Sequence, residues 1–186
     1  MLLVEVRWHG RGGQGIVTVS RLLAQAALLD DKYVQAFPEF GPERRGAPVT
    51  GYTRISGEPI YIHSQIYNPN IVVIVDPTLL GNANITKGLV EDGTVVAHTD
   101  KNPEELRGEL KIEKTKVYTV NAMRIALDIL GRPIYNTAML GALIKAMPIT
   151  TLESLNKVVT ERFPGAAGEK NVAEIKRAYE EAVGSE

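Results

Sequence analysis

The apolar positions of this chain alternate between short strand-like runs and longer helical stripes. The first run, Leu2 to Trp8, leads directly into a cluster of glycines. After the cluster, apolar residues recur at helical spacing: Ile16, Val17, Val19, Leu22, Leu23, Ala26 and Ala27. The chain is therefore predicted to open as strand, glycine-rich turn and helix.

Further apolar runs predict the rest of a sheet. The run IVVIV at 71–75 has no alternation, which is typical of a strand covered on both faces in a parallel sheet. Asp76-Pro77-Thr78 ends that strand and is expected to open a short helix. Strands are also predicted at Tyr33–Phe37, Thr94–Ala97 and Val117–Val120, with a hairpin of Val49–Ile55 and Pro59–Ile62 around Ser56-Gly57.

From Asn121 onward the pattern predicts helices. One ends at Gly131, and the next, 135–147, has Asn136 as its expected cap. Two more stripes follow: Leu152, Leu155, Val158 and Val159, then Val172, Ile175, Tyr179 and Ala182. The small residues Ala138, Gly141 and Ala142 suit close packing against another element or another subunit. Strands alternating with helices predict the α/β class: one three-layer Rossmann-like domain over 1–186, with a mostly parallel sheet and a helical C-terminal part.

Composition narrows the possible functions. The 21 basic and 22 acidic residues leave a net charge of −1, which argues against nucleic acid or an acidic membrane as partner. There is no cysteine, so this chain holds no disulfide, thiolate nucleophile or cysteine-bound Fe–S cluster. The N-terminal apolar run is broken by Glu5 and Arg7, and no run reaches membrane-spanning length. We expect a cytoplasmic protein.

The glycine cluster carries the first candidate site. Gly10, Arg11, Gly12, Gly13, Gln14 and Gly15 match G-x-G-x-x-G between a strand and a helix. Such a turn lets the backbone approach a phosphate, which the amides and the dipole of the following helix then stabilise. The alternative is that the glycines only allow a tight turn. A nicotinamide site also needs an acidic residue after the second strand, and Glu39 follows Pro38, so a general phosphate site is favoured.

A second candidate lies in the segment PEFGPERRGAP, residues 38–48. Arg44 and Arg45 stand there among prolines, glycines and aromatic residues. They form either a solvated charge cluster or a ligand or subunit contact, and the constrained, partly apolar loop favours contact. No catalytic side chain is predicted, because no Ser/His/Asp set, paired carboxylates or metal-ligand spacing can be found.

Three segments together resemble one family: RWHGRGGQG at 7–15, YVQAFPEFGPERRGAPV at 33–49 and NTAMLGAL at 136–143. IVVIVDPTLL at 71–80 fits the same pattern. They resemble the gamma subunit of 2-oxoacid:ferredoxin oxidoreductases, and ERRGAPV favours the pyruvate (pyruvate synthase) type. The resemblance runs in order over nearly the whole chain.

This resemblance implies a subunit that is inactive alone. The enzymes convert pyruvate, coenzyme A and oxidised ferredoxin to acetyl-CoA, CO2 and reduced ferredoxin, using alpha, beta, gamma and delta subunits. Thiamine diphosphate and 4Fe-4S clusters belong to the partner subunits. The gamma subunit is similar to the domain associated with coenzyme A (catalytic domain III) of single-chain relatives. The lack of cysteine fits that division.

The resemblance and the glycine turn together define the expected site. Amides of Gly10, Gly12, Gly13 and Gly15 would hold a coenzyme A phosphate, and Gln14 would orient a polar group. Arg11, Arg44 or Arg45 would neutralise the anion or pair across a subunit interface. The alternatives are a 2-oxoisovalerate, 2-oxoglutarate or indolepyruvate relative, a purely structural subunit, and a stand-alone nucleotide-binding domain.

Overall fold

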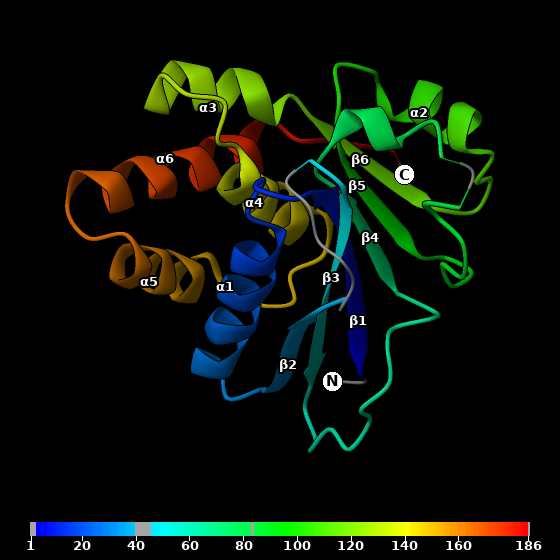
Figure 1. Cartoon of the computed structure of the whole chain (residues 1–186), viewed down its shortest axis with the longest axis horizontal. Helices are drawn as coiled ribbons and strands as arrows, with labels where there is room; N and C mark the ends of the chain where they lie inside the picture. Colours follow the sequence, from blue (N-terminus) through cyan, green and yellow to red (C-terminus); the bar gives the residue numbers. More distant parts are fainter. Residues whose placement is uncertain (1–2, 40–45, 83, 186) are drawn as a thin grey trace.

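The computed structural model describes residues 3–39, 46–82 and 84–185 as one α/β domain. Its seven strands form one sheet in the order β2-β3-β1-β4-β5-β6-β7 (Figure 1). The strands are β1 (Val4–Arg11), β2 (Tyr33–Pro38), β3 (Pro48–Ser56), β4 (Ile71–Ile74), β5 (Thr94–His98), β6 (Lys116–Val120) and β7 (Val183–Ser185). The α/β class predicted from the alternating pattern is confirmed.

The centre of the sheet is parallel and its edges are antiparallel. Strands β1, β4, β5 and β6 pair in parallel. Strand β3 runs antiparallel to both β1 and β2, and β7 runs antiparallel to β6. Since β2 reverses the direction of β3 again, five of the seven strands point the same way. The mostly parallel sheet is confirmed in this sense of direction.

Helices cover the two faces of the sheet unequally, which makes three layers (Figure 1). The larger core lies under α1 (Ile16–Leu29), α3 (Ala122–Leu130), α4 (Asn136–Ala146), α5 (Leu152–Arg162) and α6 (Ala166–Glu181). On the opposite face α2 (Pro103–Leu110) and the 3-10 turn η1 (Pro77–Leu79) pack on β4, β5 and β6. The β1–β3 part of that face carries none of the described helices.

Helices α4 and α6 run side by side in the same direction. Thr137 near the start of α4 contacts Asn171 and Glu174, and Lys145 near its end donates to the Glu180 carbonyl. Between them lies Gly141, where an added Cβ would sit 2.0 Å from the Ile175 carbonyl oxygen. The predicted close packing of the small residues on α4 therefore occurs within this chain.

Two local predictions were wrong. Residues 59–62 are not a strand, because β3 already pairs on one side with β1 and on the other with β2. Asn136 does not cap α4: Tyr135 holds the cap position, and the Asn136 amide instead donates to the Gly15 carbonyl at 3.4 Å.

The remaining boundaries follow the pattern closely. Helix α3 ends at Gly131, whose φ of 67° is the left-handed conformation expected of a glycine stop. The strand ending at Asp76 does open the short η1 turn. No helix within residues 3–39, 46–82 and 84–185 is both long and apolar enough to cross a bilayer.

Candidate functional site at the glycine turn

The glycine turn lies at the carboxyl end of β1, where parallel α/β sheets commonly bind ligands. Its backbone is fixed by the chain that leads into β3. The Gly12 amide donates to the Ala47 carbonyl at 2.8 Å, and the Gly46 amide donates to the Gly12 carbonyl at 3.1 Å. The Gly12 amide is therefore already used and is not one of those that can meet an anion.

The Gln14 side chain makes two hydrogen bonds that hold the turn together. Its side-chain oxygen accepts from the Arg11 amide at 2.7 Å, and its nitrogen donates to Asp76 Oδ2 at 2.6 Å. The Arg11 guanidinium donates to Thr78 Oγ1, at 2.8 Å from Nη2, and its Nε lies 3.5 Å from Asp76. Both side chains therefore tie the turn to the end of β4, and we call this set of contacts the Asp76 clasp.

Asp76 is ionised in this clasp. Burial opposes its charge, but hydrogen bonds from Thr78 and Gln14 and the charge of Arg11 outweigh burial, so its pKa lies below the usual value. A lasting negative charge here keeps Arg11 in place. The structure thus makes Arg11 a fixed part of the turn, with one face still partly open to solvent.

Gly13 and Gly15 have the backbone that the turn needs, with φ of 96° and 75°. Gly15 is also crowded, because a Cβ there would lie 2.3 Å from the Asn136 side-chain nitrogen. Gly15 is the N-cap residue of α1, and no side chain caps this helix start. The first turn of α1 thus keeps amides that are not occupied by a capping side chain.

A cavity of about 340 Å³ opens in front of this helix start. Gly13, Gln14 and Gly15 form one wall, and Pro133, Ile134, Tyr135 and Asn136 with Met123 form the other. Gly10, Arg11 and Gly12 do not line this cavity. Arg44 and Arg45 lie outside the described residues, although Gly46 and Ala47, which follow them, contact the turn.

Sequence reasoning missed the far wall of the cavity. Asn136 was assigned a cap role, and Ile134 and Tyr135 were given none. The available signal was the segment 136–143, which belongs to the same resemblance as the glycine turn. A second cavity, about 490 Å³ in volume, adjoins the first and shares Ile134 and Asn136 with it.

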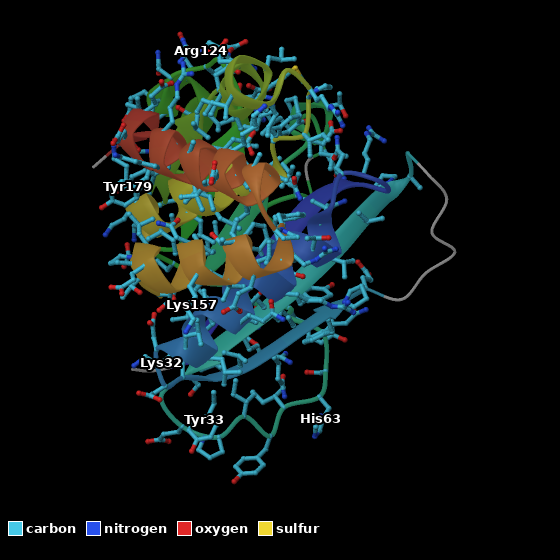
Figure 2. All side chains as sticks on the ribbon, turned by 90° about the vertical axis from the view of Figure 1, so that its left-hand side faces the viewer. Lys32, Tyr33, His63, Arg124, Lys157 and Tyr179 are labelled. Atoms are coloured by element: carbon cyan, nitrogen blue, oxygen red, sulfur yellow. The ribbon has the colours of Figure 1, made fainter. Side chains whose placement is uncertain are left out.

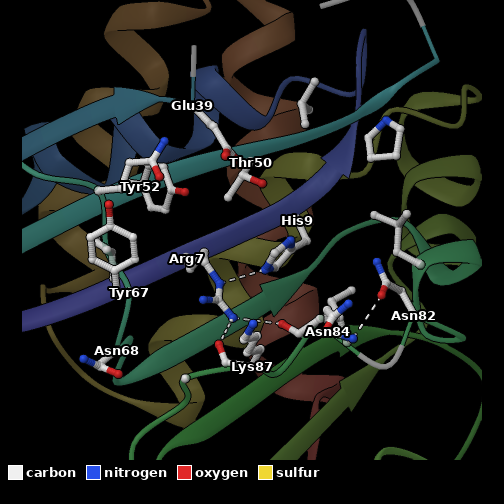
Figure 3. Close-up of a pocket in the computed structure, with 17 residues that line it drawn as sticks. Arg7, His9, Glu39, Thr50, Tyr52, Tyr67, Asn68, Asn82, Asn84 and Lys87 are labelled. Atoms are coloured by element: carbon white, nitrogen blue, oxygen red, sulfur yellow. Dashed lines mark hydrogen bonds between the residues drawn. The ribbon is translucent and has the colours of Figure 1, made fainter. Parts of the chain in front are cut away.

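A larger cavity, about 690 Å³, lies elsewhere, on the β1–β3 part of the sheet face opposite the larger core (Figure 3). Here the Arg7 guanidinium donates to the Ile85 and Lys87 carbonyls and to His9 Nε2. Burial and the Arg7 charge lower the pKa of His9 to about 3. His9 is therefore a neutral hydrogen-bond acceptor that supports Arg7, and it does not exchange protons near neutral pH.

Within the described part of the chain, no group of three or more His, Asp or Glu side chains is placed to hold a metal ion. The glycine turn and its cavity share one feature with anion sites, a helix start without a side-chain cap that faces a cavity.

Comparison with known proteins assigns the family. The model of the family described as pyruvate ferredoxin/flavodoxin oxidoreductase matches residues 5–181. The pyruvate/ketoisovalerate oxidoreductases common subunit gamma of Pyrococcus furiosus is 51% identical over 178 residues, 96% of each chain. Pyruvate synthase subunit PorC of Methanothermobacter marburgensis is 47% identical, over 96% of this chain and 97% of its own length.

A solved structure supports the same family assignment as these two relatives. The pyruvate oxidoreductase subunit PORC of Thermotoga maritima superposes with a TM-score of 0.88 and 41% identity, covering all of both chains. This chain belongs to the pyruvate ferredoxin/flavodoxin oxidoreductase family.

Proposed function

We propose that this chain is the gamma subunit of a cytoplasmic, multisubunit pyruvate:ferredoxin oxidoreductase. It works with alpha, beta and delta subunits, which carry thiamine diphosphate and the 4Fe-4S clusters and pass electrons to ferredoxin. Its own contribution is to bind coenzyme A and to contact the other subunits. It performs none of the redox chemistry, and its cysteine-free sequence supports this division.

The start of α1 carries the proposal for coenzyme A. Gly13 is exposed, Gly15 begins a helix without a side-chain cap, and both face the cavity. Amides at a helix start stabilise a phosphate because they donate hydrogen bonds and lie at the positive end of the dipole. A diphosphate of coenzyme A placed there would leave its pantetheine and adenosine parts free to extend along the surface.

The oxoacid specificity is proposed to lie with other subunits. The relative from Pyrococcus furiosus is named as a subunit common to pyruvate and ketoisovalerate oxidoreductases. One gamma chain that serves two oxoacids in that organism supports a role in a step that both reactions share. Acyl transfer to coenzyme A is such a step.

A matched pair of substitutions tests this proposal in the assembled enzyme. Gly13→Asn and Gly13→Asp have nearly the same shape, and both residues tolerate positive φ better than most. The aspartate adds a charge that would repel a phosphate. We expect the KM for coenzyme A to be about tenfold higher for Gly13→Asp than for Gly13→Asn, with the KM for pyruvate unchanged.

The enzyme is purified anaerobically through a tag on this chain and assayed by dye reduction with pyruvate and coenzyme A. Equal KM values for coenzyme A in the two variants would exclude phosphate binding at the turn and favour a purely structural subunit. A tagged chain that purifies without larger subunits, iron and thiamine diphosphate would contradict the subunit assignment itself.

A further inference from the structure

The segment 57–70, which links β3 to β4, is a loop with several exposed apolar side chains; we call it the tyrosine loop. Tyr61 is 81% exposed, Tyr67 66% and Ile62 43%. Glu58 is its one Asp, Glu, Lys or Arg residue, although these types make up 23% of the whole chain. Exposed tyrosines in a segment with so little charge are typical of the centre of a protein–protein interface.

The tyrosine loop is held in place by a buried arginine of β3. Arg54, which is 1% exposed, donates from Nη2 to the Ser64 carbonyl at 2.8 Å and to the Gln65 carbonyl at 3.3 Å. Earlier in the loop, the Ile60 carbonyl accepts from the Gln35 amide at 3.4 Å. A loop fixed in this way presents its tyrosines with little conformational entropy left to lose on binding. These contacts favour a contact surface over a solvated connection.

The tyrosine loop borders the larger cavity of about 690 Å³, hereafter the Arg7 cavity. Residues 65–68 of the loop line this cavity. Figure 3 shows Arg7 between Tyr67 of the loop and Asn82 beyond β4, with Glu39 farther across the cavity. None of the described helices covers this part of the sheet, so the loop and the cavity form one accessible region.

Arg7 is a buried cation without an ionic partner among the described residues. It is 8% exposed, and Glu39, which lines the same cavity, forms no ion pair with it. Nε and Nη2 donate to His9 and to the Ile85 and Lys87 carbonyls, whereas Nη1 has no hydrogen-bond partner in the described part of the chain. Burial lowers the pKa of Arg7, but a guanidinium stays charged at any ordinary pH.

A carboxylate from outside the chain would complete this site. A buried charge is costly unless it is paired, and a guanidinium forms strong hydrogen bonds with a carboxylate. The side chains of Asn68, Asn82 and Asn84 also line the cavity, and an amide can both donate to and accept from a polypeptide backbone. A protein that presents an acidic side chain therefore matches the buried cation, the amides around it and the apolar loop beside it.

We propose that the Arg7 cavity and the tyrosine loop are the docking surface for a partner subunit of the same enzyme. That subunit places an Asp or Glu side chain beside Arg7 and packs apolar side chains on Tyr61 and Tyr67. This inference rests on the proposed function as a subunit, but it does not depend on coenzyme A binding at the glycine turn. It assigns a subunit contact to the sheet face opposite the larger core.

Substitution of one exposed tyrosine tests the surface without disturbing the core. The complex is purified anaerobically through a tag on this chain, and its dissociation is followed by size and activity as it is diluted. Tyr67→Ala should raise the dissociation constant at least about tenfold. Tyr179→Ala is the matched control, because Tyr179 is an exposed tyrosine on α6, far from His63 of the loop in Figure 2. It should leave the dissociation constant unchanged, and neither variant should lower the Tm of the free chain.

A zero-length cross-link tests the proposed carboxylate directly. Arg7→Lys keeps the positive charge and places a primary amine in the cavity. A carbodiimide joins such an amine to an adjacent carboxylate through an amide bond, with loss of one water molecule, and peptide mass spectrometry identifies the two residues. We expect a cross-link from position 7 to an Asp or Glu of a partner subunit in the assembled enzyme. The Tyr67→Ala measurement decides the inference if Arg7→Lys does not fold.

Unchanged assembly of Tyr67→Ala, or cross-links from position 7 to Glu39 alone, would overturn the inference and leave the subunit assignment standing. A cross-link to a second copy of this chain would also overturn it, because the occupant would then be another copy. An original tagged chain that purifies without partner subunits would instead reject the proposed function on which this inference rests.

Discussion

The six α-helices fall into two sets at their starts. Asn102, Asn121 and Thr151 cap α2, α3 and α5, each accepting a hydrogen bond from a backbone amide at 2.9, 2.9 and 3.1 Å respectively. Helices α1, α4 and α6 begin at Gly15, Tyr135 and Gly165 with no side-chain cap.

The capped and the uncapped helix starts lie in different parts of the molecule. The capped starts are satisfied within the chain, whereas residues at the uncapped starts line two adjoining cavities, the one at the glycine turn and the second cavity, which shares Ile134 and Asn136 with it. A side-chain cap stabilises a helix by about 1 kcal/mol relative to alanine, whereas glycine at the cap position loses only a few tenths of that. The cost therefore falls mainly on α4, which begins at Tyr135. The lesson is that these three helix starts keep backbone amides that no capping side chain occupies, and the proposed function uses those of α1.

Breaking the contact between two uncapped helices should have the largest effect. Gly141→Ala places a methyl group against the Ile175 carbonyl and must push α4 and α6 apart. We expect the free energy of unfolding to fall by about 3 kcal/mol, measured by urea denaturation. Gly108→Ala is the control: this glycine lies in exposed α2 with no atom within 4 Å of an added Cβ, so the change should stabilise by up to about 1 kcal/mol. Similar losses for both variants would contradict close helix contact.

The second-largest effect on stability is expected from Glu174, a buried acid near the starts of α4 and α6. Thr137 Oγ1 lies 2.8 Å from Asn171 Oδ1 and 2.7 Å from Glu174 Oε2, but it has one proton to donate. Asn171 also uses its amide nitrogen on the Ala167 carbonyl, so its oxygen needs that proton. Both contacts are satisfied only if Glu174 is protonated and donates to Thr137.

Burial raises the pKa of Glu174 from 4.5 to about 7. The folded state therefore holds this proton when the unfolded state has released it, and stability falls as pH rises from about 4.5 to 7. Glu174→Gln should remove this loss. Between pH 4.5 and pH 8, the stability of the variant relative to the original protein should therefore rise by about 3 kcal/mol. Thermal unfolding across this pH range measures it, and parallel curves for both proteins would show that Glu174 ionises normally.

Removing a cap from the other set should have the smallest effect. Asn102→Ala breaks the capping box with Glu105 at the start of α2 and should lower the free energy of unfolding by about 1 kcal/mol. The KM for coenzyme A should not change, because α2 lies on the opposite face of the sheet from the cavity at the glycine turn. A raised KM for coenzyme A would contradict the assignment of coenzyme A binding to the uncapped helix starts alone.

The sequence predicted correctly those elements that are defined by patterns within short segments. The glycine turn between β1 and α1, and the apolar runs of β4, β5 and β6, were readable because periodicity and glycine spacing are properties of short segments. The false hairpin arose because β3 pairs with β1, some forty residues earlier, and no short-range signal reports that partner. Helix α2 was missed because only Pro103 and Leu106 of it are buried, although Asn102 and Glu105 form a recognisable capping box.

The candidate site was only half predictable for the same reason. Gly13, Gln14 and Gly15 belong to one motif, and the cavity does form around them. The second cavity is built from the ends of α3 and α5 and the first turns of α6, so Arg132, Arg162 and Lys170, which line it, come together only through tertiary packing. Nothing in their spacing distinguishes them from the other basic residues of the chain.

The Asp76 clasp has a thermodynamic consequence for any ligand of the turn. A loop with four glycines in six residues would ordinarily move among many backbone conformations and lose that freedom when it binds. Here Gln14 and Arg11 fix the turn to the end of β4, so most of this entropy is already lost when the chain folds. The ligand then meets a rigid surface, and little of its interaction energy is spent on ordering the protein.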